Sequence, residues 1–349
     1  GEIIEEKPYA YQVVNGEQKE IRCDFKLKKN LVTFKLGSYN KNIPLIIDPS
    51  LIFATYCGAL SDNFGMTATY GHDGSAYSAG TVYGNNYPTP DPNAYDVNSN
   101  FTALSGNYGI TDVFVSKYSA DGANMLWGTF LGGGDNFQGT ETAHSLICDT
   151  SDNIYVFGAT SSIDFPTTTG AFQPSHGGGG GGMDFLFNGV YFSNQGTDIF
   201  LSKISSNGQN LIGSTYVGGS DNDGINTRYG VLFNAVTAYD SLVTNYGDQF
   251  RGEIMLDSAN NILVASCSRS TNFPVQNAFQ AVKDHGQDGV VFKLKNDFTS
   301  MIFSSFYGGN NEDACYSVKI DSSDNIVFAG GTTSNNLTGL NNGLFPSFQ

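Results

Sequence analysis

The chain has 349 residues, 43 of them glycine, and a formal net charge of −16 at pH 7. This acidic balance argues against a nucleic-acid partner, because phosphate binding depends on clustered lysine and arginine. No apolar run is long enough to span a membrane, so the sequence predicts no direct membrane insertion. A chain of this length is compatible with one large all-β domain, a class that often exceeds the usual domain size.

Residues 1–50 differ in pattern from the rest and are predicted to form a small antiparallel β domain, the end of a larger domain. Asn15-Gly16 and residues 28–30 are compact turn signals between alternating strands. The strands expected around these turns are Tyr9–Val14, Glu20–Leu27 and Leu31–Leu36. The segment Leu51–Gly58 then resembles the closing strand of the repeats that follow. We interpret it either as the strand that completes the final sheet or as the last strand of the N-terminal domain.

Beyond residue 50 the chain repeats a phrase that reads DVFVSKYSADGANMLWGTFLGG at Asp112–Gly133 and returns at Asp198–Gly219 and Asp288–Gly309. Each copy has an apolar run ending in a lysine, a polar turn, a second strand-like run and paired glycines. The lysines are Lys117, Lys203 and Lys293. They are expected either to form a charged ring at one rim or to lie along the surface and pair with nearby acids. A repeat of this size indicates a repeat architecture.

A second phrase lies between copies of the first and reads SDNIYVFGATSSIDFP at Ser151–Pro166. Related versions occupy His72–Pro88, Ala259–Pro274 and the segment from Ser323. Asn-Ile after a polar turn starts a strand, and proline ends the unit because it cannot donate to a sheet ladder. The two phrases together predict four antiparallel strands per unit, as in a β-propeller blade.

The expected fold class is therefore all-β, with a β-propeller over residues 51–349 that is incomplete or part of a larger ring. Runs that are apolar on both strand faces, such as Val113–Val115 and Ile199–Leu201, are typical of strands buried between neighbouring sheets. Three nearly complete blades and a partial fourth are expected at 64–133, 140–219, 227–309 and 314–349.

These motifs resemble the SBBP family of bacterial β-propeller repeats, whose pattern runs D-x-F-V-x-K, S-T-Y-L-G-G, G-N-V-Y-V-T-G, D-F-P and A-F-Q. The last element appears here as Ala171–Gln173, Ala278–Gln280 and Ser347–Gln349. The N-terminal segment is similar to the β-rich domain that commonly precedes such repeats. Two departures are Gly289 in place of an apolar residue and Cys57-Gly58-Ala59 in place of Leu-Gly-Gly.

The resemblance implies an exported protein, extracellular or on the outer face of the outer membrane, from bacteria that use type IX secretion and often glide. It implies no defined catalytic activity, so we expect a non-enzymatic structural, adhesive or recognition module and a secreted cargo protein. Its partners would be glycans or other surface or secretion-system proteins. Two alternatives stay open. One is a scaffold subunit of a surface or secretion complex, and the other is a polysaccharide-acting lyase or glycosidase with paired carboxylates in a central funnel.

Candidate site residues lie in the irregular segments, because packing and turns explain most recurrent residues. Asp221, Asn222 and Asp223 form a glycine-bounded turn whose oxygens could hold calcium, although turn propensity alone also explains them. No other cofactor is expected, and no catalytic residue is assigned. Six tyrosines in loop insertions are candidates for a binding surface, although such tyrosines are equally common in ordinary β-rich loops. They are Tyr83, Tyr87, Tyr95, Tyr229, Tyr239 and Tyr246.

Two further expectations concern covalent chemistry. The tripeptides around Ser241 and Ser258, Asp-Ser-Leu and Asp-Ser-Ala, look like the O-glycosylation acceptor pattern of the same bacteria. The five cysteines are scattered and lack CxxC spacing, which favours buried free thiols over the alternative of a single disulfide.

Overall fold

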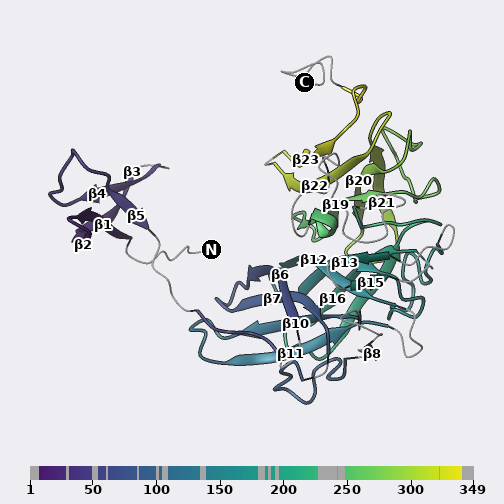
Figure 1. Cartoon of the computed structure of the whole chain (residues 1–349), viewed down its shortest axis with the longest axis horizontal. Coiled ribbons are helices and arrows are strands. Elements are labelled where there is room, and N and C mark those ends of the chain that lie inside the picture. The colour runs from purple at the N-terminus through teal and green to yellow at the C-terminus, as the bar shows by residue number, and fades with distance from the viewer. Residues whose placement is uncertain are drawn as a thin grey trace. The chain divides into compact units, whose positions relative to one another are not determined.

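The chain folds as two compact units, Gly1–Tyr56 (unit 1) and Cys57–Gln349 (unit 2), so the boundary lies slightly beyond the expected one at residue 50. In the computed structural model the described residues are almost entirely β-strand or connecting loop, with one short 3-10 helix, η1 (Asp248–Phe250) (Figure 1). No helix among them is long and apolar enough to cross a membrane. The described residues are 8–28, 31–48, 54–59, 62–84, 86–99, 102–103, 109–133, 139–179, 185–187, 190–192, 196–226, 242, 248–321 and 323–339.

Unit 1 contains a three-stranded sheet and a separate hairpin. The sheet has the order β2 (Glu17–Ile21), β1 (Tyr9–Val14), β5 (Ile46–Asp48), and the hairpin pairs β3 (Cys23–Lys28) with β4 (Leu31–Leu36). Asn15 and Gly16 both adopt positive φ, 52° and 85°, as a two-residue hairpin turn requires. The turn and two of the three expected strands are thus confirmed.

The expected single strand over Glu20–Leu27 is wrong, because the chain changes partner at Arg22. Up to Ile21 it pairs with β1, and from Cys23 it pairs with β4. The carbonyl of Arg22 instead accepts a hydrogen bond from Gly37 N–H at 2.7 Å. The alternation of apolar and polar residues continues past Arg22, so it gives no sign that the chain changes its pairing strand there.

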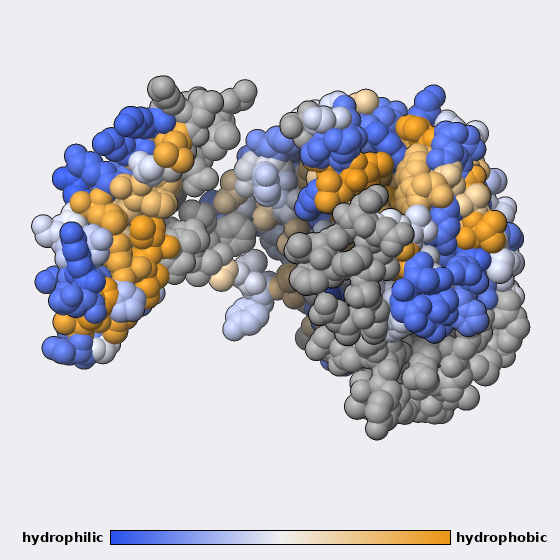
Figure 2. Space-filling view, turned by 90° about the horizontal axis from the view of Figure 1, so that it is seen from above, coloured by the Kyte–Doolittle hydropathy of each residue, from blue (hydrophilic) through white to orange (hydrophobic). Residues whose placement is uncertain are grey.

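The expected strand over Leu51–Gly58 is also not found where the structure describes the chain. Residues 54–58 form no strand, and residues 51–53 lie outside the described part. Tyr56 is fully exposed, so the segment lacks the burial that would stabilise a strand in a sheet. Several apolar side chains of unit 1 are also exposed, and Figure 2 shows orange surface on this body. They include Leu27, Leu31 and Phe34.

Unit 2 contains three four-stranded antiparallel sheets in which the strands follow chain order. The first sheet is β6 (Asn63–Tyr70), β7 (Ala76–Val82), β10 (Asp112–Tyr118) and β11 (Met125–Leu131). The second is β12 (Glu141–Cys148), β13 (Ile154–Thr160), β16 (Asp198–Ile204) and β17 (Leu211–Val217). The third is β18 (Glu253–Leu256), β19 (Ile262–Ser268), β20 (Asp288–Leu294) and β21 (Met301–Tyr307).

A fourth sheet has two strands in the described part, β22 (Asp313–Ile320) and β23 (Ile326–Thr332). A small additional sheet joins insertions of the first two sheets of unit 2 in the order β14 (Phe185–Phe187), β15 (Val190–Phe192), β9 (Gly109–Ile110), β8 (Thr102–Ala103). The described strands do not close into a ring, so the structure supports an all-β array of antiparallel sheets.

Successive sheets of unit 2 are stacked side by side, with the first strand of each sheet against the first strand of the next (Figure 1). Contacts join β6 to β12, β12 to β18 and β18 to β22. Separate apolar clusters fill the spaces between sheets, for example Val115 with Val156, and Phe157 with Phe292. Both β10 and β13 are buried along their whole length. The second sheet, with β13, lies between two sheets, whereas on β10 of the first sheet Tyr87 stacks on Phe114.

The three repeated lysines occupy the same place on the third strand of each sheet. Each binds an aspartate in the turn between the first and second strands: Lys117–Asp73 at 2.9 Å, Lys203–Asp149 at 2.9 Å and Lys293–Asp257 at 2.6 Å. Of the two expectations, pairing with local acids is therefore the one observed. Burial alone would raise the pKa of Asp149, but hydrogen bonds from Lys203 and Asn153 hold it below its usual value. The pair ties the third strand to the turn that joins the first two.

A β-bulge interrupts the first strand of three sheets at Met66, His144 and Tyr316. The third sheet has a long insertion at the same point, because Asp223 bridges Ser268 and the strand resumes only at Glu253, opposite Ala265. The described parts of this insertion lie against the first strands of the other sheets. Phe250 packs near His144, with ring centroids 6.0 Å apart, and Asn226 Nδ2 donates to the Tyr316 hydroxyl at 3.2 Å.

The buried ion pair on the second sheet should contribute more to stability than an exposed pair. We expect Lys203→Met to lower the free energy of unfolding by about 3 kcal/mol, because it leaves the Asp149 carboxylate buried, 4% exposed, without its cation. Lys295→Met is the matched control. Lys295 and Asp297 are half exposed and 3.9 Å apart, so their loss should have little effect. Urea denaturation measures both, and equal losses would contradict this account.

Candidate functional site

The most unusual chemistry in the described residues is a carboxyl pair buried between each two successive sheets. One acid is the first residue of a third strand, and the other lies where the first strand of the next sheet begins. We call these the junction pairs: Asp112–Glu141, Asp198–Asp223 and Asp288–Asp313. All six side chains are at most 2% exposed. Six buried carboxyl groups need hydrogen-bond donors or retained protons around them, because isolated charges are costly to remove from water.

The paired glycines that end each fourth strand allow this close approach. A Cβ on Gly218 would overlap Asp198 Oδ1 and would lie 2.9 Å from Asp223 Oδ2. Gly132 is placed in the same way over Asp112 and Glu141. The second glycine supplies a backbone donor to the acid of the next sheet. These bonds are Gly133 N–H to Glu141 Oε2 at 3.3 Å, Gly219 N–H to Asp223 Oδ2 at 2.6 Å and Gly309 N–H to Asp313 Oδ2 at 2.8 Å.

Serine hydroxyls that follow each second strand also donate to the acid of their own sheet. Ser270 Oγ donates to Asp223 Oδ2 at 2.8 Å, and Ser268 Oγ donates to Asp223 Oδ1. Ser334 Oγ donates to Asp313 Oδ2 at 2.7 Å in the same manner. These donors lower the pKa of Glu141 and Asp223 and so oppose the larger effect of burial, which raises it.

In the two Ala-Phe-Gln tripeptides that the structure describes, the glutamine holds the other acid of the pair. Gln173 Nε2 donates to Asp198 Oδ2 at 2.9 Å, while its Oε1 accepts from Gly218 N–H at 3.0 Å. Gln280 makes the same two bonds to Asp288 and Gly308, at 3.0 and 3.1 Å. The tripeptide thus links the third strand to the end of the fourth, which explains why it recurs.

Two of the third-strand aspartates, Asp198 and Asp288, each have one oxygen that no donor satisfies. Asp198 Oδ1 and Asp288 Oδ1 are buried and have no hydrogen-bond partner in the described structure. Burial, and then the adjacent Asp223, raise the pKa of Asp198 to about 8. Burial and Asp112 likewise raise the pKa of Glu141 to about 8, and burial raises the pKa of Asp288 to about 7. Near neutral pH each junction pair therefore retains a proton, which supplies the missing donor.

The junction pairs keep a proton near neutral pH, but they are buried and closed to a substrate. A general acid or base must lie within hydrogen-bonding distance of the group that it protonates, and these carboxyls are enclosed by two sheets. No group of three or more His, Cys, Asp or Glu side chains among the described residues is arranged to hold a metal ion. We conclude that the junction pairs hold sheets together.

The raised pKa values predict that the protein loses stability as the pH rises. Between about pH 4 and 8 the unfolded chain releases protons that the folded chain keeps on Glu141, Asp198 and Asp288, so proton release favours unfolding. The melting temperature, measured by calorimetry, should fall by roughly 5 °C or more between pH 5 and 9. A melting temperature that rises over this interval would contradict the assignment.

The variant Asp198→Asn distinguishes the contribution of this junction pair to the pH dependence of stability from that of other titrating groups. The amide keeps an acceptor for Gln173 and Gly177 and places a permanent N–H donor beside Asp223, as the protonated acid does. We expect a shallower pH dependence and a higher melting temperature at pH 9 than in the unaltered chain. Asp297→Asn removes the same charge from an exposed turn and should leave the slope unchanged.

The fold places the residues of the expected calcium site, Asp221, Asn222 and Asp223, in different surroundings. Asp223 points into the junction with Asp198, where its oxygens already accept hydrogen bonds from two serines and Gly219. Asp221 Oδ1 accepts a hydrogen bond from the backbone N–H of the next residue, Asn222, at 2.8 Å. The structure therefore assigns Asp223 a role between sheets that turn propensity did not indicate.

The expected binding tyrosines differ in exposure. Tyr87 is buried, its ring stacks on Phe114 at 4.3 Å, and its hydroxyl bonds to Ser116 Oγ at 2.8 Å, so it is a core residue and not part of a binding surface. Tyr83 and Tyr95 are half-buried and pack against apolar clusters. Tyr229, Tyr239 and Tyr246 lie outside the described residues.

The covalent expectations are partly testable on the structure. Ser258 lies exposed in the turn between β18 and β19, whereas Ser241 lies outside the described residues. All five cysteines are free thiols, and four of them are buried, as expected from their spacing. Burial raises the pKa of Cys267 above its usual range, so this thiol is unreactive.

Sequence reasoning did not identify the junction pairs, although a signal was present. Each copy of the repeat has an aspartate at the start of the third strand and an acid shortly after the paired glycines. Their proximity depends on how one sheet stacks on the next, which strand periodicity does not encode.

Comparison with known proteins assigns part of unit 1 only. Residues 1–50 match a family model described as a domain of unknown function, DUF7948. No curated protein matches the chain. The match covers less than half of the sequence, so it bears on the N-terminal segment.

Proposed function

We propose that unit 2 is an array of β-propeller blades and that the chain is a non-enzymatic structural, adhesive or recognition module exported to the bacterial surface or medium. Three features support the propeller: the four-stranded antiparallel sheets, the stacking of first strands on one another and the repeated junction pairs. Known propellers have about four to eight blades, so a closed ring needs more strands than those described.

One observation carries the functional part of the proposal. The recurrent polar residues are engaged within the fold: Lys203 by Asp149, Gln173 by Asp198, and Asp223 by Gly219 and the serines. Residues that are bonded within the fold in this way, and are buried at the junctions, are directed toward neighbouring strands and sheets and not toward a ligand. Recognition is therefore assigned to the non-repeated insertions, where loops on a rigid scaffold most often bind partners.

The scaffold alternative is favoured by a different surface. Unit 1 exposes Leu27, Leu31 and Phe34, which are 72%, 62% and 46% accessible. Leu27 and Phe34 share one face of the β3–β4 hairpin with the exposed Phe25, and apolar side chains gathered in this way are typical of a protein contact. The polysaccharide-acting alternative receives no such support, because the junction carboxyls are closed to solvent and a glycosidase needs its two acids around an open cleft.

A carbohydrate array probed with the intact chain tests the recognition proposal. We expect saturable binding to a subset of glycans, weakened at least tenfold when Tyr229, Tyr239 and Tyr246 are changed together to alanine, because aromatic rings dominate such contacts. Tyr70→Ala, an exposed tyrosine on β6, is the matched control and should bind as the unaltered chain does.

Three other outcomes would count against recognition by the insertions. They are an absence of glycan binding, an equal effect of Tyr70→Ala, and turnover of a bound polysaccharide. Recovery of a stoichiometric protein from cell envelope, lost on Leu27→Ser and Leu31→Ser, would support the scaffold alternative instead.

A further inference from the structure

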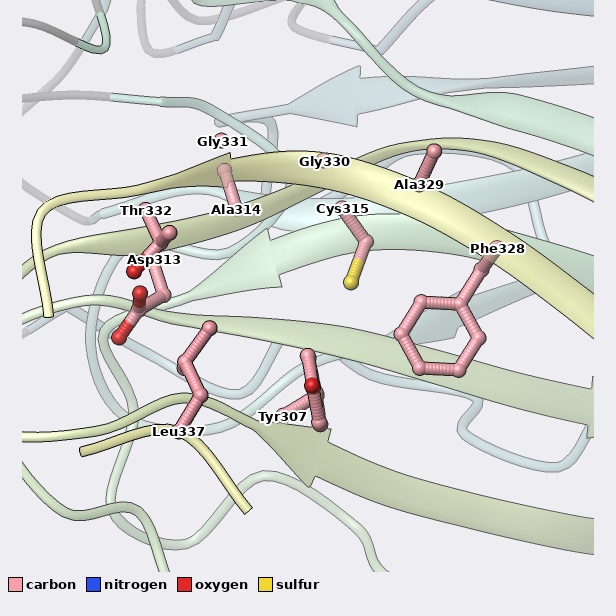
Figure 3. Close-up of a pocket in the computed structure, with 10 residues that line it drawn as sticks. All are labelled: Tyr307, Asp313, Ala314, Cys315, Phe328, Ala329, Gly330, Gly331, Thr332 and Leu337. Carbon is pink, nitrogen blue, oxygen red and sulfur yellow. The ribbon is translucent and has the colours of Figure 1, made fainter. Parts of the chain in front are cut away.

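The residue that precedes each third strand bonds to the next sheet. In the first two sheets it is a threonine whose hydroxyl donates to the backbone carbonyl of a junction acid, Thr111 to Glu141 at 3.1 Å and Thr197 to Asp223 at 2.9 Å. In the third sheet this position holds Gln287, whose Nε2 donates to the carbonyl of Asp313 at 3.2 Å. Figure 3 shows this start of β22 beside Tyr307 of the third sheet. Threonine meets the requirement of the other junctions, so the longer glutamine calls for a separate explanation.

The amide of Gln287 also reaches the long insertion of the third sheet. A side-chain amide has two N–H donors, and Gln287 Nε2 also donates to Asn226 Oδ1 at 2.7 Å. Asn226 lies three residues after Asp223, where the chain leaves the third sheet. The side chains of Asn226 and Gln287 are 1% and 0% exposed, so this bond is made away from water, where the loss of a partner is costly. The change from threonine to glutamine thus occurs in the sheet whose first strand carries the insertion.

Asn226 holds the insertion at three points. Its backbone N–H donates to Gln249 O at 3.0 Å, and these two residues form the neck at which the chain leaves and returns. Its Nδ2 donates to Leu242 O at 2.9 Å, within the insertion, and to the hydroxyl of Tyr316 at 3.2 Å. Because Tyr316 is the bulged residue of β22, Asn226 links the neck to the fourth sheet.

Apolar packing also holds the neck. Ile225 and Phe250 adjoin it in the sequence, and both are buried in one cluster with Phe192 from the insertion of the second sheet. The ring of Phe250 lies 6.0 Å from that of His144, the bulged residue of the second sheet. The neck is therefore fixed by contacts with the second sheet as well as the fourth.

An ion pair at the same junction holds the backbone of Gln287. Arg269 Nη2 lies 2.8 Å from Glu312 Oε2, and the same oxygen accepts from the backbone N–H of Gln287 at 3.1 Å. The guanidinium side chain is 2% exposed. At the junction of the second and third sheets the corresponding residues are Ser161 and Asn222, as their equivalent backbone bonds show. The charged pair thus occurs at the junction where glutamine replaces threonine.

We propose that Asn226 and Gln287 are positioning residues, which hold the neck of the third-sheet insertion on the fourth sheet so that the insertion meets its ligand in one arrangement. A buried polar network with satisfied hydrogen bonds makes an arrangement rigid. A binding segment that is ordered in advance loses less entropy when the ligand binds. The fourth sheet thus takes part in recognition without touching the ligand. The effect on ligand binding rests on the proposed function, whereas the effect on the neck does not.

The variant Gln287→Thr tests the proposal, because it restores the residue that the first two sheets use. Its hydroxyl can keep the bond to Asp313, while the bond to Asn226 is lost. Amide hydrogen exchange at Asn226, measured by NMR on the intact chain, should become at least tenfold faster, since its bond to Gln249 then opens more often. Exchange in β13 should stay the same.

A second variant removes the other contact of Asn226 with the fourth sheet. Tyr316→Phe keeps the ring but lacks the hydroxyl that accepts from Asn226, so it should also speed exchange at Asn226. Tyr307→Phe is the matched control. Its hydroxyl bonds to Thr338 O at 3.2 Å, away from the insertion, and its loss should leave exchange at Asn226 unchanged.

Glycan binding is the second measurement. For a glycan that the unaltered chain binds, Gln287→Thr should weaken the affinity about tenfold while the melting temperature falls by no more than about 5 °C. Unchanged exchange at Asn226, or faster exchange spread equally over β13 and β19, would overturn the proposal, as would faster exchange with unchanged affinity. Absence of glycan binding by the unaltered chain would count against the proposed function alone, because exchange at Asn226 would still decide whether the two residues hold the neck.

Discussion

The burial of a carboxyl pair between each two sheets constrains the rest of unit 2. Two acids can be enclosed together only if donors surround them and a proton remains on one of them. The paired glycines, the serines after the second strand and the glutamine of the tripeptide meet this requirement at Asp198–Asp223. They recur because the requirement recurs at every junction. Much of the repeat pattern therefore describes how one sheet is attached to the next.

A second tie acts within each sheet. The ion pair of Lys203 with Asp149 joins the third strand to the first turn, while the junction pair at Asp198 joins the start of the same strand to the following sheet. The two ties respond oppositely to acid, since one depends on an ionised aspartate and the other on a protonated one. Together they hold each third strand near both of its ends.

Most of the local structure could be predicted from the sequence. The alternation and turn signals predicted the strands of the repeats, and the continuous apolar run around Val113–Val115 predicted burial on both faces. Contacts between distant segments could not be predicted. Tyr87 lies in a stretch rich in asparagine and proline, yet it stacks on Phe114. Asp223 lies in a turn, and its hydrogen bond with Ser270 of the next segment depends on how the sheets stack. The change of partner at Arg22 was hidden for the same reason.

The bulges at Met66, His144 and Tyr316 have a consequence for how such chains diversify. A bulged residue is already out of register with its neighbours, so extra residues can be added there without shifting the pairing on either side. The third sheet exemplifies this, since its ladder resumes opposite Ala265 after the excursion. The bulged first strands of the other three sheets thus mark positions at which evolution or protein engineering can insert a new segment while the surrounding scaffold stays the same.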